Sequence, residues 1–72
     1  MNRNLLRAAM VRFGDTGEEL SAALGIARST LSAKMTSYKG ADFTQNEILT
    51  IKNRYNLSAN EIDEIFFNRE VS

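Results

Sequence analysis

One stretch of twenty residues decides the fold of this chain, TGEELSAALGIARSTLSAKM, which occupies positions 16–35. Its pattern predicts two short amphipathic helices joined by a tight turn. Thr16 can cap the first helix while the Glu19 side chain, three residues later, reaches back to the cap amide, an arrangement called a capping box. Leu20 and Leu24 then recur at helical spacing, so we expect them to share one face of that helix.

Gly25 marks the turn after the first of these helices. Only glycine adopts a left-handed backbone without a Cβ penalty, so Gly25 suits the position that follows a helix end. Ile26 follows as an apolar plug, and a second helix restarts near residue 27. The expected inner face of the second helix carries Ala27, Leu31 and Met35. Small residues that would let the two helices cross closely are Ser21, Ala22 and Ala23. This geometry is that of a helix-turn-helix.

The segment EELSAALGIARSTLS, residues 18–32, resembles the helix-turn-helix of the Cro/repressor superfamily of temperate-phage regulators. The later run FTQNEI, residues 43–48, is similar to the fourth helix of phage Cro-type proteins. A further resemblance is to the modulator-of-repression proteins of Gram-positive temperate phages. These resemblances reach from about Leu5 to Phe66 and imply a lambda-repressor-like DNA-binding domain. They also imply three partners: operator DNA, a companion repressor and, weakly, a second copy of the chain.

The remaining segments predict an all-α fold of five short helices in one domain spanning residues 1–72. The first helix should run over residues 3–13, capped by Asn2 and ended by Gly14. Its predicted inward stripe consists of Leu5, Leu6, Ala9, Met10 and Phe13. No segment alternates with period two for long enough to indicate a strand.

Two later helices show the same capping pattern. Thr44 with Glu47 opens the fourth helix, and Ser58 with Glu61 opens the fifth. Asn56 ends the fourth helix, and a polar tail from about residue 68 is expected to fray. The predicted buried face of the fourth helix is Ile48, Ile51 and Tyr55, with Leu49 beside them. The predicted apolar side of the fifth helix is Ile62, Ile65 and Phe66. Phe66 and Phe67 are adjacent, so one of them would pack inward against the first helix and leave the other partly exposed, a hint of an interface.

The composition excludes several classes of function. The chain has neither cysteine nor histidine, and it therefore lacks the residues that usually form metal sites, thiol nucleophiles and imidazole bases. We therefore expect no catalytic residue, no metal and no cofactor. No apolar run approaches about 20 residues, which excludes a membrane span. Without a leader-like segment or a disulfide, we expect a cytoplasmic, nucleoid-associated protein.

The charge is balanced overall but unevenly distributed. Nine basic and nine acidic residues give a net charge of zero. Residues 1–40 carry six basic and three acidic side chains, a sum of plus three, and residues 41–72 carry the opposite sum. A basic side could face DNA or a protein partner equally well.

The outer face of the second helix in the motif would enter the major groove. The predicted DNA-binding residues are Thr16, Gly17, Arg28, Ser29, Thr30, Ser32, Ala33, Lys34 and Lys39. Arg28 is the one candidate for bidentate readout of guanine, and Lys34 and Lys39 would reach phosphates. Seryl and threonyl hydroxyls can add single hydrogen bonds.

Two departures from the family pattern weaken the prediction of these DNA-binding residues. Gly17 stands where a phosphate-contacting glutamine is common, and Lys34 stands where an apolar residue is usual. A second mechanism therefore stays open, in which the chain is an antirepressor or modulator that binds a companion repressor. The predicted partner surface in that case is Arg28, Ser29, Ser32, Ala33 and Thr36. These small side chains would allow close approach by another helix.

Overall fold

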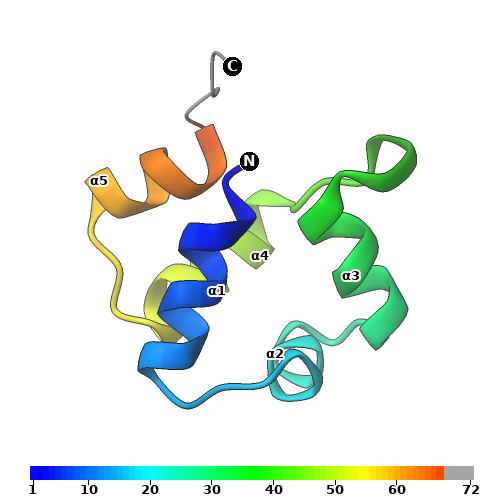
Figure 1. Cartoon of the computed structure of the whole chain (residues 1–72), viewed down its shortest axis with the longest axis horizontal. Helices are drawn as coiled ribbons and strands as arrows, with labels where there is room; N and C mark the ends of the chain where they lie inside the picture. The colour runs from blue at the N-terminus through cyan, green and yellow to red at the C-terminus, as the bar shows by residue number, and fades with distance from the viewer. Residues whose placement is uncertain (68–72) are drawn as a thin grey trace.

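The computed structural model describes residues 1–67, and within this range the chain is all-helical without a strand. Its elements are α1 (Arg3–Arg12), α2 (Gly17–Leu24), α3 (Arg28–Thr36), the 3-10 turn η1 (Tyr38–Gly40), α4 (Gln45–Arg54), α5 (Ala59–Ile62) and the π-helical turn η2 (Asp63–Phe67). In Figure 1, α1 crosses the middle of the molecule, with α5 on one side and α2 and α3 on the other. The tail predicted to fray lies outside the described residues. No helix in residues 1–67 combines the length and the apolar character that a membrane crossing requires.

The helix starts follow the local sequence. All three predicted capping boxes are confirmed, with both hydrogen bonds present at the starts of α2, α4 and α5. The Asn2 side chain caps α1 by accepting a hydrogen bond from the Leu5 amide at 3.3 Å. Each cap satisfies amide groups that the helix itself leaves unpaired, and each contributes about 1 kcal/mol.

The turn between α2 and α3 depends on Gly25. Its backbone is left-handed (φ 70°, ψ 30°), and the Gly25 and Ile26 amides donate to the last carbonyl groups of α2. Ser21 is buried, as expected for a small residue at the crossing, but Ala22, Ala23 and Ala27 are exposed. The prediction was therefore wrong for these three alanines, and the buried residues of α2 and α3 are Leu20, Ser21 and Leu31 instead.

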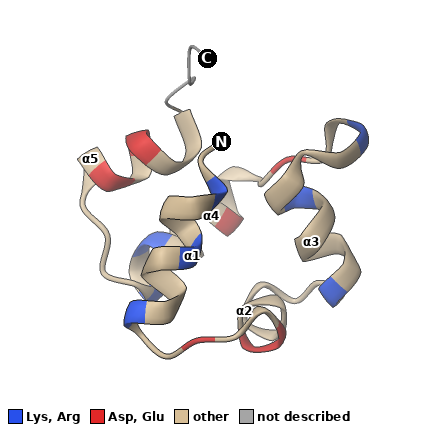
Figure 2. Ribbon diagram, viewed as in Figure 1, with Lys and Arg blue, Asp and Glu red and all other residues tan. Residues whose placement is uncertain are grey.

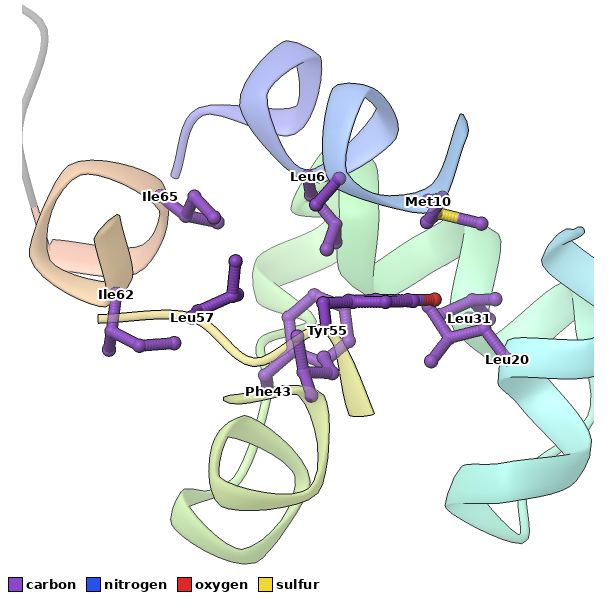
Figure 3. Close-up of a cluster of buried hydrophobic side chains, with 11 residues drawn as sticks. Leu6, Met10, Leu20, Leu31, Phe43, Tyr55, Leu57, Ile62 and Ile65 are labelled. Carbon is purple, nitrogen blue, oxygen red and sulfur yellow. The ribbon is translucent and has the colours of Figure 1, made fainter. Parts of the chain in front are cut away.

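A single core joins all five helices. The buried apolar side chains are Leu6, Ala9, Met10, Leu20, Leu31, Phe43, Ile51, Tyr55, Leu57, Ile62 and Ile65. Figure 3 shows the Tyr55 ring in the middle of this cluster, with side chains of α1 on one side and Phe43 on the other. Phe66 packs edge-on against Phe43 with ring centroids 5.5 Å apart, while Phe67 is exposed.

Three apolar side chains that we predicted near the core are exposed instead. They are Leu5, Phe13 and Leu49, with 38%, 51% and 55% of their surface accessible. α1 ends at Arg12, so Phe13 is its C-cap residue and leaves the helical stripe. Helical spacing restricts the buried face only to a broad arc, and within this arc Leu6 enters the core whereas Leu5 does not.

A polar clasp connects the α1–α2 loop to the end of α4. The Asp15 carboxylate accepts hydrogen bonds from the Arg54 guanidinium, through Nε and Nη2 at 2.8 Å each, and from the Tyr55 hydroxyl. The Arg54 guanidinium, and after it the Tyr55 hydroxyl, hold the pKa of Asp15 below its usual value. Burial, followed by the Asp15 carboxylate, raises the pKa of Tyr55. The clasp fixes where α2 begins relative to α4.

Candidate functional site

A groove of about 220 Å³ lies between α1, the first residue of α2 and α3. Three arginines line it: Arg3 and Arg7 from α1, and Arg28 from the first turn of α3. Its other lining residues are Met10, Gly17, Leu31, Ser32, Met35 and Thr36. The groove therefore combines three guanidinium groups and two hydroxyl groups with an apolar floor. We call it the arginine groove.

The position of Arg28 depends on the absence of a side chain at Gly17. A Cβ atom added to Gly17 would lie 2.6 Å from Nε and 3.1 Å from Cζ of Arg28. The guanidinium thus occupies the space beside the N-terminus of α2, where backbone amides attract anions. The arginine from α3 therefore stands beside the first residue of α2.

The arginine groove collects most of the free positive charge. Residues 1–67 contain eight basic side chains, and three of them form ion pairs, Arg12 with Glu61, Lys34 with Glu47 and Arg54 with Asp15. That leaves five, of which three line the groove, and none of its lining residues is acidic. Figure 2 shows the basic segments of α1 and α3 apart from the acidic segments of α5. A groove with three guanidinium groups and no acid is suited to an anionic ligand.

Lys34 does not lie in the groove. Its ammonium group lies 2.6 Å from a carboxylate oxygen of Glu47, and both side chains are mostly buried, with 14% and 11% of their surface accessible. Burial raises the pKa of Glu47, but the hydrogen bonds from Lys34 and Thr44 outweigh it and leave this pKa below its usual value. Lys34 thus ties α3 to the start of α4, and it is not a free phosphate contact.

The other predicted DNA-binding residues fall into two groups. Gly17, Arg28 and Ser32 line the groove, together with Thr36 from the predicted partner surface. The members outside it are Thr16, Ser29, Thr30, Ala33 and Lys39. Ser29 and Thr30 are exposed on α3, and Ala33 is half-buried. The Thr16 hydroxyl caps α2 by accepting from the Glu19 amide at 3.1 Å, while Lys39 is exposed with its ammonium group 5.5 Å from the Tyr38 ring centre.

Arg3 and Arg7 are the groove residues that the sequence interpretation missed. It assigned neither of them to a site. A signal was present, because Arg3, Arg7 and Met10 follow i, i+4, i+7 spacing and therefore share one face of a helix. That spacing alone does not reveal that α3 lies opposite this face.

Two further searches give no ligand or relative. No group of three or more acidic side chains in residues 1–67 is placed to hold a metal ion. Comparison of the chain with family models, curated proteins and solved structures finds no match. The functional interpretation therefore depends on the groove and on α3.

Proposed function

We propose that this chain is a transcriptional regulator of a phage-type genetic switch that contacts operator DNA through a helix-turn-helix formed by α2 and α3. The observation that carries the proposal is the arginine groove beside α3. It places Arg28 beside the N-terminus of α2, the end of the motif at which DNA phosphates bind, and adds Arg3 and Arg7 from α1 to the same groove.

The arginine groove and the exposed face of α3 would have different roles in DNA recognition. The groove supplies charge for phosphates, which positions a protein on the duplex without reading sequence. The exposed hydroxyl groups of Ser29 and Thr30 lie on α3, where they can donate to base edges in the major groove. Because these contacts are single hydrogen bonds, we expect modest sequence preference and strong dependence on salt.

The test is titration of a mixed-sequence DNA duplex at several salt concentrations, read by fluorescence anisotropy. Arg7→Ala and Arg28→Ala should each weaken binding, and each should reduce the slope of log K against log salt by about 0.9. Lys52→Ala removes a cation that does not line the groove and serves as the matched control. If the unmodified protein binds no duplex at low salt, direct DNA binding is refuted.

A second candidate is an antirepressor that binds a companion repressor instead of DNA. Two observations favour it. α3 presents small side chains without a bidentate partner for adenine, and the groove is lined in part by the partly buried Met35. Apolar side chains contribute nothing to phosphate binding but can hold a protein side chain.

Ala33→Gln separates the two candidates. The added amide inserts bulk into a packed protein contact and should disrupt a repressor complex, whereas direct DNA binding should persist or change its sequence preference. The measurement is a titration of promoter DNA with this chain in the presence and in the absence of a companion repressor. An unchanged affinity for the repressor would exclude α3 as the partner surface.

A further inference from the structure

A second charged surface lies on the outer side of α5 and η2. Asn60, Asp63, Glu64 and Phe67 line one shallow hollow there. Their spacing of i, i+3, i+4 and i+7 is that of residues on one helical face. Asp63 and Glu64 are exposed and form no ion pair within residues 1–67, and Phe67 has 61% of its surface accessible. We call these four residues the acidic stripe.

The acidic stripe complements the arginine groove in both charge and polarity. The groove offers three guanidinium groups above an apolar floor, and the stripe offers two carboxylates beside an exposed aromatic ring. Arginine pairs with carboxylates through two parallel hydrogen bonds, and methionine sulfur contacts aromatic rings favourably. A phosphate would use only the arginines, whereas Phe67 could also contact Met35, which is only partly buried.

The stripe of one molecule does not fill its own groove. Ile62 and Ile65 turn the opposite side of α5 and η2 into the core, so the stripe faces outward. The Asn2 amide also donates to the Ile65 carbonyl at 2.7 Å, which fixes η2 beside the start of α1. Only the stripe of another molecule can therefore reach the groove.

We propose that the arginine groove binds the acidic stripe of a second copy of this chain, with Asp63 and Glu64 on the arginines and Phe67 on Met35. Groove and stripe are different surfaces, so the contact is heterologous and each added copy leaves one groove and one stripe free. Assembly should then be weak, sensitive to salt and open-ended. It also places the stripe in competition with any other anion for the groove.

The test uses the full chain alone, with its mean mass measured by sedimentation equilibrium across a concentration series at low and high salt. At low salt the mean mass should rise with concentration and pass beyond that of a dimer. Raising the salt from about 0.05 M to about 0.5 M should weaken the association at least about tenfold. A monomer at every concentration, or a mass that stops at two copies, would overturn the proposal.

Two variants test whether the association uses the arginine groove and the acidic stripe. Arg7→Glu reverses one charge in the arginine groove and leaves the acidic stripe unchanged. Glu64→Arg reverses one charge in the acidic stripe and leaves the arginine groove unchanged. Each should be monomeric alone with an unchanged circular dichroism spectrum, and their equimolar mixture should form a one-to-one dimer that grows no further. Lys52→Glu, the matched control, should assemble like the unmodified protein.

A mixture of Arg7→Glu and Glu64→Arg that stays monomeric would refute the groove–stripe contact, as would either variant assembling alone. If a variant fails to fold, Arg3→Gln and Asp63→Asn are milder replacements for the same two surfaces. Because the assay contains no DNA, its failure leaves the DNA-binding proposal standing, and a failure of DNA binding leaves this proposal standing.

Discussion

The Asp15 clasp gives the sharpest test of the fold, through the variant Asp15→Ala. The Asp15 side chain has only 6% of its surface accessible, and Tyr55, whose hydroxyl donates to it, has 1%. Within residues 1–67 every buried side-chain nitrogen or oxygen has a hydrogen-bond partner. Asp15→Ala removes the acceptor of the Tyr55 hydroxyl and leaves that group buried without one.

The loss of stability in Asp15→Ala follows from the Tyr55 hydroxyl, which is left without an acceptor. Leaving a buried donor unsatisfied costs about 1–3 kcal/mol, so we expect the free energy of unfolding to fall by about 2 kcal/mol. The lost Arg54 bonds add little, because the guanidinium is partly exposed and can be hydrated. For a domain of this size, about 2 kcal/mol lowers the melting temperature by roughly 8–16 °C.

Tyr55→Phe provides the second corner of a double-mutant cycle. Alone it removes a hydrogen bond to a charged acceptor and should cost about 1.5 kcal/mol. In the double variant no hydroxyl is left unsatisfied, so its cost should fall short of the sum of the single costs by at least about 1 kcal/mol. Urea denaturation at pH 7 gives the free energy of unfolding of the unmodified protein, the two single variants and the double variant. Additive costs would refute the argument.

The clasp also predicts a dependence on pH. Because the pKa of Asp15 is lowered in the folded chain, the stability from its ionised form is present above the unfolded pKa of about 3.9. That stability is lost as the pH falls through the lower, folded pKa. The difference in unfolding free energy between the unmodified protein and Asp15→Ala should therefore narrow below about pH 4. A difference that stays constant down to pH 2 would contradict the assignment of the shift to the clasp.

Three other substitutions test local features. Gly25→Val should destabilise the fold by more than about 1 kcal/mol through its positive φ alone, because no atom lies within 4 Å of the added Cβ; a neutral result in thermal denaturation would contradict this. Lys34→Met keeps the volume of the side chain but removes its charge, so the pKa of Glu47 should rise in a carbon-detected NMR titration, and an unchanged pKa would exclude the ion pair. Gly17→Ala should displace Arg28 without loss of stability, visible as a shift of the Arg28 Nε–H resonance, and an unmoved resonance would show that the two residues are not in contact.

Many features of the fold could be predicted because they depend on residues within a few positions of one another. Thr16 and Glu19 form a capping box within a single helical turn, and Gly25 ends α2 through its own backbone freedom. Asn56 likewise ends α4 with a positive φ of 51°. Such interactions form wherever the segment is helical, so the arrangement of the rest of the chain does not alter them.

The exposed faces of the helices were less predictable. Leu5 and Leu6 are adjacent and equally apolar, yet only Leu6 is buried. The rotation of a helix about its own axis is set by the elements that pack on it, and here η2 packs on α1. Ala27 is exposed for a different reason, because it is the N-cap residue of α3, with an extended backbone, and lies outside the helix.

The sequence alone therefore determined the number of helices, their caps and the turn before α3, all of which follow from interactions between near neighbours. Tertiary structure decided which charges remain free. Lys34 meets Glu47 across 13 positions and Asp15 meets Arg54 across 39, whereas Arg3 and Arg7 meet Arg28 in a groove without an acid. Helix packing places these groups side by side, and a charge that has found a partner in the fold is no longer available to a ligand.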